Sequence, residues 1–258
     1  MKHTKQLLAA GIILGLNTLA AHADLINNGN GLIYDTAQNI TWTQDANLLA
    51  TMEAGDPNVV NEIIAASGGV IYDTPNIFDN GTYTLSAADF AGGGTVDWWG
   101  AQAFVGYLNS ISYDGSTQWA LPNTPAATAV LGSAYYITDS DFGELFYNEL
   151  GGIAGTSLQT SPFSNLQSDV YWSATESVSN PLDTLSFDTS IGLQNFEGKT
   201  AVGFAWAVSP GNIATAGNVS FSNAVGVPIP GAIWLFGTGM LGLLGLRHRG
   251  NFGCEPIV

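Results

Sequence analysis

The sequence predicts a single α+β domain of short, mostly antiparallel strands with about three helices, lying between an N-terminal signal peptide and a C-terminal hydrophobic helix. Three observations support this prediction. Turn dipeptides are frequent in the middle of the chain, short β-type runs lie between them, and three stretches have helical spacing or helix-capping residues. Turns between neighbouring strands favour antiparallel hairpins, and the interspersed helices favour an α+β fold.

The expected strands are short runs of β-branched and aromatic residues bounded by turns such as Asn30-Gly31 and Asn80-Gly81. In chain order they cover residues 32–34, 41–43, 70–72, 171–173 and 204–208. The first expected helix has Asp56 as its cap and Pro57 at its first position, and it ends before Gly68-Gly69.

The second expected helix has an apolar stripe with the spacing i, i+3, i+7 and i+10. Its members are Trp98, Ala101, Val105 and Leu108. The third expected helix begins at Asp141, with Glu144 completing a capping box and Gly151 as its stop.

The charge of the chain excludes several classes of function. Its 258 residues include 5 basic and 21 acidic ones, for a net charge of −16. Between Asp24 and Leu246 the one basic residue is Lys199, so phosphate backbones are repelled and nucleic-acid binding is excluded. Cys254 and all three histidines lie outside this stretch, which excludes Ser-His-Asp, Cys-His and His-ligated zinc chemistry there.

Residues 1–23 are predicted to be a secretory signal peptide that signal peptidase removes. Lys2 and Lys5 form its charged region, residues 7–16 its apolar core, and Ala21 and Ala23 flank His22 in a small-x-small cleavage site. A retained anchor helix is the alternative, which the short apolar run disfavours. The mature chain is expected to begin at Asp24, outside the cytoplasm.

The C-terminal end is predicted to be a sorting signal over residues 227–249, which follows a small, polar linker over 212–226. Val227, Pro228 and Pro230 precede the apolar segment 231–246, which is short for a transmembrane helix. Arg247 and Arg249 then mark the cytoplasmic side, and a tail, 250–258, follows. A buried core helix is the alternative interpretation of the apolar segment.

This end resembles the VPLPA variety of the PEP-CTERM sorting signals of Gram-negative bacteria. The resemblance rests on the proline motif 227–230, the run 234–239 and the terminal arginines. It implies recognition by an exosortase-type sorting enzyme at the inner membrane, cleavage near the prolines, and release to the cell surface or extracellular matrix. The tail after the arginines is a departure, because such signals usually stop at the basic cluster.

A second resemblance covers nearly all of residues 30–211, within the expected domain 24–211. The segments 32–36, 119–122, 144–145, 171–176 and 205–211 resemble, in this order, motifs of the Lcl C-terminal domain family, long described as a domain of unknown function. The resemblance implies a C-type-lectin-like fold, and the best-known member of the family binds sulfated glycosaminoglycans. Because Ala120 and Ser209 stand where the family has arginines, sulfated sugars are not expected to bind this chain.

Tryptophans are the strongest candidates for contact with a ligand, because exposed indoles stack on sugar rings. The candidates are Trp98, Trp99, Trp119 and Trp172. Core packing is the competing interpretation, but adjacent helical residues point about 100° apart. One of Trp98 and Trp99 is therefore expected to be partly exposed.

Acidic residues give two further hypotheses. Calcium is the cation that suits an extracellular site without His or Cys. Its weak candidates are Asp73 and Asp79 in one cluster and Asp139 and Asp141 in another. Asp141 is also explained as a helix cap. A carboxylate pair about 5–9.5 Å apart could instead hydrolyse glycosidic bonds.

The sequence therefore predicts an exported, non-enzymatic surface or extracellular-matrix protein that binds polysaccharide or another matrix component. No cofactor is expected, although calcium is possible. The alternatives are a carboxylate-dependent glycan-processing enzyme and a structural surface protein without a ligand. Binding and turnover measured on polysaccharide panels would separate the three.

Overall fold

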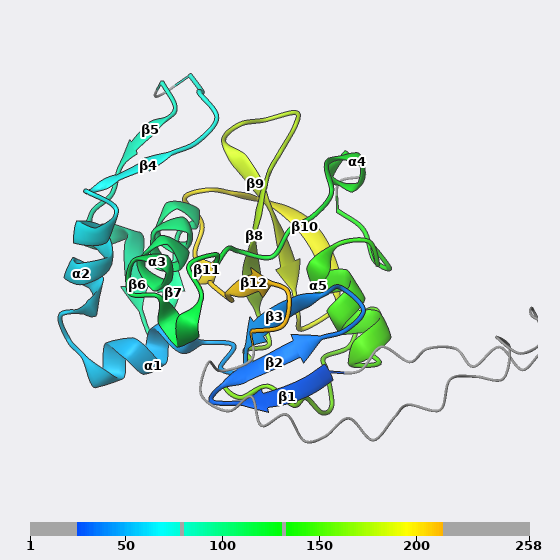
Figure 1. Ribbon diagram of the computed structural model, residues 1–258. Coiled ribbons are helices and arrows are strands. Elements are labelled where there is room, and N and C mark those ends of the chain that lie inside the picture. The colour runs from blue at the N-terminus through cyan, green and yellow to red at the C-terminus, as the bar shows by residue number, and fades with distance from the viewer. Residues whose placement is uncertain (1–24, 78–79, 131–132, 214–258) are drawn as a thin grey trace, which may run out of the picture. The chain divides into compact units, whose positions relative to one another are not determined.

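Two main β-sheets and a separate hairpin organise the described part of the chain (Figure 1). The computed structural model describes residues 25–77, 80–130 and 133–213. The first sheet has the order β1-β2-β3-β12, and all its pairs are antiparallel. Its strands are β1 (Leu25–Gly29), β2 (Leu32–Asp35), β3 (Ile40–Thr43) and β12 (Val208–Pro210).

The second sheet has six strands in the order β10-β9-β8-β11-β7-β6. Its strands are β6 (Phe90–Gly92), β7 (Thr95–Val96), β8 (Val170–Glu176), β9 (Asp183–Asp188), β10 (Leu193–Gly198) and β11 (Gly203–Phe204). Its pairs are antiparallel except β8 with β11. The hairpin of β4 (Val70–Tyr72) and β5 (Thr82–Thr84) projects beyond α2 and α3 in Figure 1. The predicted α+β class with mostly antiparallel strands is confirmed.

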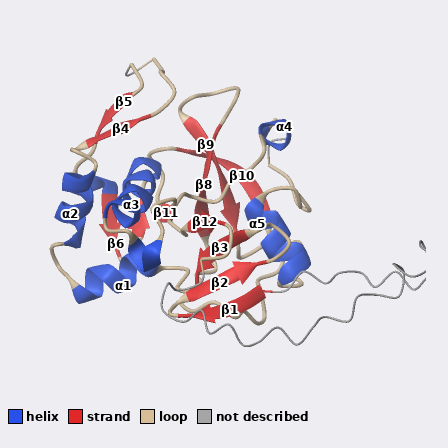
Figure 2. Cartoon of the chain, viewed as in Figure 1, coloured by secondary structure: helices blue, strands red, loops and turns tan. Residues whose placement is uncertain are grey.

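The described part of the chain has about five helices, whereas the sequence predicted about three in the domain. They are α1 (Leu48–Gly55), α2 (Val59–Ala66), α3 (Trp98–Ser110), α4 (Ala126–Ala129) and α5 (Asp141–Gly143), which continues as a π-helical turn, η3 (Glu144–Glu149). Short 3-10 turns lie at η1 (Ala87–Asp89) and η2 (Tyr113–Gly115). Figure 2 shows α1, α2 and α3 grouped beside β6, with α5 on the opposite side of the strands. Within the described residues, no helix has both the length and the apolar character that crossing a membrane requires.

Local sequence explains where several elements begin and end. Asn30 and Gly31 form the loop between β1 and β2, and their φ angles of 53° and 79° fit a two-residue hairpin turn. The predicted stripe of α3 is confirmed, because all four members are buried. Asp97 caps that helix by accepting a hydrogen bond from the Gly100 N–H at 2.8 Å.

Two helix caps differ from the prediction. Helix α2 begins at Val59, after Asn58, and the predicted cap Asp56 instead accepts a hydrogen bond from the Asn58 N–H. Helix α5 begins at Asp141 as predicted, but its cap is Ser140, whose hydroxyl accepts from the Gly143 N–H at 3.1 Å. At α5 the neighbouring Ser140 satisfies a free N–H group at the start of the helix, whereas at α2 the Asn58 side chain makes no capping hydrogen bond.

The expected strand over 204–208 is split between the two sheets. The chain leaves the six-stranded sheet after Phe204 and joins the four-stranded sheet at Val208. Trp206 lies between them and donates a hydrogen bond from Nε1 to the Thr43 carbonyl at 2.9 Å. An unbroken buried run is compatible with a crossing segment as well as with a single strand, which is why the sequence pattern missed the break.

Two apolar clusters fill the interior of the described part of the chain. The first surrounds α3 and includes Leu49, Ile63 and Phe104. The second is mainly aromatic and centres on Trp206, whose ring lies 4.8 Å from Trp42 and 4.7 Å from Phe163 between ring centroids. This second cluster supports the candidate site described below.

Several predictions concern residues outside the described part of the chain. They are the cleavage site at Ala21 and Ala23, the sorting signal with Val227, Pro228, Pro230, Arg247 and Arg249, the apolar segment 231–246, and the calcium candidate Asp79. The linker over 212–226 is described only at its first two residues, where Asn28 donates to the Asn212 side chain and the Ile213 N–H donates to Thr41 Oγ1.

Candidate functional site

The four candidate tryptophans all lie in the interior. The expectation that Trp98 or Trp99 is partly exposed is wrong, because they are 2% and 5% exposed. The β4–β5 hairpin covers the outer side of α3, and Tyr83 stacks on Trp99 with a centroid distance of 3.8 Å. Trp119 and Trp172 are also buried. In this structure none of the four rings presents an exposed face for stacking on a ligand.

Each of these indoles uses its N–H inside the protein. Trp98 donates to the Ser173 carbonyl, Trp119 to the Tyr113 carbonyl and Trp172 to the Val96 carbonyl, each at 2.9 Å. Trp99 donates to Asp73 Oδ2 at 3.0 Å. These bonds fix the rings as packing groups.

The described calcium candidates are engaged by other groups. Asp73 accepts from Lys199 Nζ at 2.6 Å, and Asp139 accepts from the Thr128 hydroxyl. Asp141 accepts from the Asn123 N–H at 2.7 Å, and burial raises the pKa of its carboxyl. Over residues 25–77, 80–130 and 133–213, no group of three or more His, Cys, Asp or Glu side chains converges as a metal site would.

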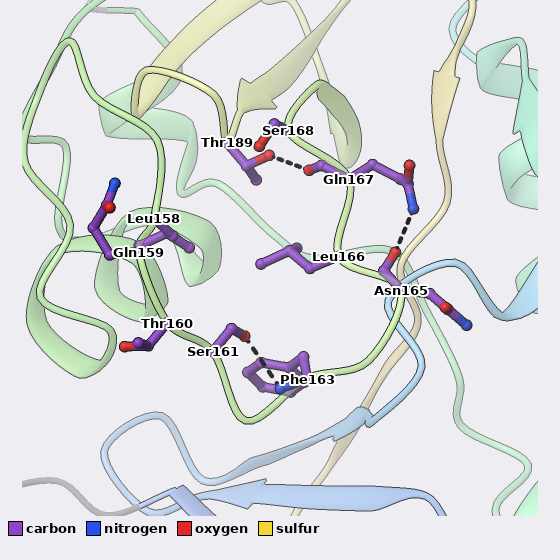
Figure 3. A pocket seen from close by; sticks show the side chains of 10 residues that line it. All are labelled: Leu158, Gln159, Thr160, Ser161, Phe163, Asn165, Leu166, Gln167, Ser168 and Thr189. Atoms are coloured by element: carbon purple, nitrogen blue, oxygen red, sulfur yellow. Dashed lines mark hydrogen bonds between the residues drawn. The ribbon is translucent and has the colours of Figure 1, made fainter.

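A hollow with a volume of about 340 Å³ lies beside the segment that connects η3 to β8 (Figure 3). This volume falls in the range of small-molecule sites. We call it the 158–168 hollow. It is lined by Leu158, Gln159, Thr160, Ser161, Phe163, Asn165, Leu166, Gln167, Ser168 and Thr189. All ten lining residues are uncharged, although the chain as a whole carries a net charge of −16.

Hydrogen bonds within the lining fix the shape of the 158–168 hollow. Thr189 Oγ1 donates to the Gln167 carbonyl at 2.5 Å, and Gln167 Nε2 donates to the Asn165 carbonyl at 2.7 Å. The Phe163 N–H donates to Ser161 Oγ at 3.1 Å, and all three bonds are drawn in Figure 3. The Tyr171 hydroxyl also accepts from the Gln167 N–H at 2.8 Å. The hollow is therefore tied to strand β8 through Tyr171 and to Thr189, the residue that follows β9.

The floor of the hollow is apolar and its rim is polar. Leu158 and Leu166 point toward each other across the centre, and both also line a small apolar cavity beneath, next to Trp206 (Figure 3). Phe163 is 7% exposed and packs edge-on against Trp206. Gln159, Thr160 and Ser168 are exposed. Amides and hydroxyls over an apolar floor can bind an uncharged, polyhydroxylated ligand through hydrogen bonds and apolar contact.

Sequence reasoning did not find this hollow. Its segment is a run of Ser, Thr, Gln and Asn residues between a helix and a strand, which resembles an ordinary loop. The available signal was Phe163 within that run, because an aromatic residue in a polar loop has to pack against something. Which cluster it packs against depends on contacts distant in the sequence.

A buried carboxyl pair lies elsewhere, at the start of α3. Asp89 and Asp97 are both 7% exposed. Asp89 accepts from the Tyr83 hydroxyl at 2.6 Å, while Asp97 accepts from the Gly100 N–H. Burial raises the pKa of Asp97 to about 7, with a further contribution from the charge of Asp89 and an opposing one from the Gly100 N–H. Neither residue lines the 158–168 hollow. The pair instead affects the stability of the fold, in a way that depends on pH.

Asp97→Asn is expected to raise the free energy of unfolding by about 1–2 kcal/mol at pH 8 and to leave it nearly unchanged below about pH 3.5. The raised pKa means that the folded chain keeps a proton which the unfolded chain releases near pH 4. The resulting stability is fully present below about pH 3.8 and is lost progressively as the pH rises from there to about 7. Asparagine imitates the protonated form and still caps the helix. Urea denaturation at the two pH values measures the difference, and an equal effect at both would contradict the explanation.

We compared the chain with known protein families, curated proteins and solved structures. No family model matches the chain, and neither the curated proteins nor the solved structures gave a match.

Proposed function

We propose that the protein is an exported, non-enzymatic surface or extracellular-matrix protein that binds a neutral polysaccharide in the 158–168 hollow. The observation that supports the proposal is the lining itself, where ten uncharged residues surround about 340 Å³ in a strongly acidic chain. Sugar hydroxyls donate and accept hydrogen bonds, as do the amides of Gln159 and Gln167 and the hydroxyls of Thr160 and Ser168. The leucine floor suits the C–H faces of a sugar ring.

Charge favours a neutral glycan over an acidic one. The lining offers no cation to pair with sulfate or carboxylate groups. The acidic residues elsewhere repel polyanions, with Lys199 as the one basic residue between Asp24 and Leu246. Binding through the hollow also needs no calcium, because no carboxylate lines it.

The wider setting of the proposal comes from the sequence resemblances. They support a C-type-lectin-like fold, export through a signal peptide and transient insertion of the segment 231–246 in the inner membrane. An exosortase-type enzyme would then release the chain to the cell surface or matrix of a Gram-negative bacterium. After export by this route, the chain would encounter the polysaccharide of that matrix, which is therefore the proposed ligand.

The rival class, a carboxylate-dependent glycan-processing enzyme, has less support at this site. Glycoside hydrolysis needs two carboxyl groups on either side of the scissile bond. None of the ten lining residues is Asp or Glu. The Asp89–Asp97 pair is buried beneath α3 and is held by the hydrogen bonds from Tyr83 and Gly100. We therefore assign the hollow to binding.

The double variant Gln159→Ala/Thr160→Ala is expected to weaken binding of the full-length chain to its polysaccharide about tenfold. Each lost hydrogen bond contributes about 0.5–1.5 kcal/mol, and both side chains are exposed, so the fold should be unaffected. A panel of neutral and acidic polysaccharides, measured by calorimetry, identifies the ligand first. Release of reducing ends is measured alongside as the readout for turnover.

The matched control is Thr117→Ala/Gln118→Ala, which removes the same two residue types from an exposed position outside the hollow. It should bind like the unchanged chain. Equal weakening by both double variants would contradict the assignment of the site. Turnover would favour the enzyme, and a lack of binding across the panel would favour a structural protein without a ligand.

A further inference from the structure

The single lysine of the described residues lies in the interior between two carboxylates. Lys199 is 1% exposed, and its Nζ is 2.6 Å from Asp73 Oδ2 and 2.6 Å from Glu176 Oε2. The side chain of Asp73 is fully buried, and that of Glu176 is 22% exposed. Asp73 follows β4, Glu176 ends β8, and Lys199 follows β10, so the three residues join distant segments.

Tryptophan side chains shield this group from water. Lys199 Nζ lies 4.6 Å from the centroid of the Trp98 ring and 5.8 Å from that of Trp99. Trp99 Nε1 donates to Asp73 Oδ2 at 3.0 Å, and the Thr74 N–H donates to Glu176 Oε1 at 3.2 Å. The other oxygen of the Asp73 carboxyl, Oδ1, is buried and has no hydrogen-bond partner among the described residues.

We propose that Lys199 and Asp73 become joined by an amide bond, an intramolecular isopeptide cross-link, with Glu176 transferring the protons. The lysine nitrogen already touches the carboxyl group that it would attack. Holding two reacting groups in such contact replaces an encounter between molecules with a step inside one fold, which raises the rate by a large factor. The site is independent of the 158–168 hollow and goes beyond the proposed binding function.

The reaction balances without any further reactant. The Lys199 ammonium passes one proton through Glu176 to the Asp73 carboxylate, which leaves a neutral amine and a carboxylic acid. The amine lone pair attacks Cγ and forms the C–N bond. Glu176 then takes a proton from nitrogen and delivers it to the Oδ1 hydroxyl, the Cγ–Oδ1 bond breaks, and one water leaves.

The surroundings favour both the step and its product. The Trp99 N–H already points at Oδ2, where negative charge develops during the attack and where the amide oxygen remains. Loss of Oδ1 removes the buried oxygen that has no partner. The product replaces a buried ion pair, which is costly to desolvate, with a neutral amide.

The link would close a loop spanning 126 positions of the chain. It would tie the β4–β5 hairpin to the six-stranded sheet, and it would constrain the unfolded chain as a disulfide does. Disulfides have this role in many exported proteins, but residues 25–213 contain no cysteine.

Peptide mapping of the full-length folded chain by mass spectrometry tests the cross-link. We expect a peptide containing Asp73 joined to one containing Lys199, lighter than their sum by one water. The cross-linked chain should also migrate faster than the Lys199→Arg variant in a denaturing gel. Recovery of the two peptides unlinked from the folded chain would overturn the proposal.

Three variants separate the chemistry from other causes of mass loss. Asp73→Asn should give the same linked peptide, because ammonia leaves in place of water. Glu176→Gln should abolish or greatly slow linkage. Glu62→Gln is the matched control, since Glu62 accepts from the Tyr107 hydroxyl on the surface, and it should link normally. Linkage at the normal rate in Glu176→Gln would refute the proton-transfer role.

Discussion

Lys199→Met is expected to lower the free energy of unfolding by about 3–5 kcal/mol, because it leaves two carboxylates without their cation in the interior. Asp73 has no exposed side-chain surface, so water cannot replace the lost ion pair. The variant also removes the amine that the proposed cross-link requires. Urea denaturation of the full-length chain, followed by tryptophan fluorescence, measures the loss.

A triple variant isolates the effect of charge. In Lys199→Met/Asp73→Asn/Glu176→Gln the carboxylates are neutralised, and neither this variant nor the single one can form the cross-link. The triple variant is expected to be more stable than Lys199→Met by about 2–3 kcal/mol, since a neutral replacement of a buried ion pair is often tolerated. If the single variant is as stable as the triple one, the carboxylates do not depend on Lys199.

Trp206→Ala is expected to lower the free energy of unfolding about as much as Lys199→Met does, by about 3–5 kcal/mol. Trp206 is 1% exposed and lies where the chain crosses between the two sheets. Its ring contacts Trp42, Phe163 and other aromatic rings, so alanine leaves a cavity at the centre of the second cluster. The hydrogen bond to the Thr43 carbonyl is lost as well.

The control for Trp206→Ala is Tyr72→Ala, which truncates an aromatic ring that is 79% exposed. Its effect should stay within about 0.5 kcal/mol, as for most surface substitutions. Urea midpoints of the two variants give the comparison directly. Similar midpoints for both would show that the Trp206 cluster does not hold the two sheets together.

Local patterns were sufficient for much of the fold. The Asn30-Gly31 turn, the stripe of α3 and the strand at Val70–Tyr72 were all predicted, because each follows from residues close in the sequence. Helix α1 was missed, since Leu48 and Leu49 are its buried residues and two adjacent leucines give no helical period. The break after Phe204 was missed because it depends on how two sheets meet.

The candidate site was predicted less well than the fold. Helical geometry alone predicts a free face on α3, but the β4–β5 hairpin packs on that face and buries Trp99 under Tyr83. Lys199 was recognised as the one basic residue of the domain, yet its two carboxylate partners are 126 and 23 positions away. Contacts at such distances come from topology, which one sequence does not reveal.

The most direct test of the proposed function is amide hydrogen exchange of the full-length chain with and without a bound neutral polysaccharide. Binding in the hollow predicts slower exchange across residues 158–168, with residues 98–99 unchanged because the tryptophans there are already buried. Unchanged exchange over 158–168, with protection appearing in another segment, would contradict the assignment of this hollow as the binding site.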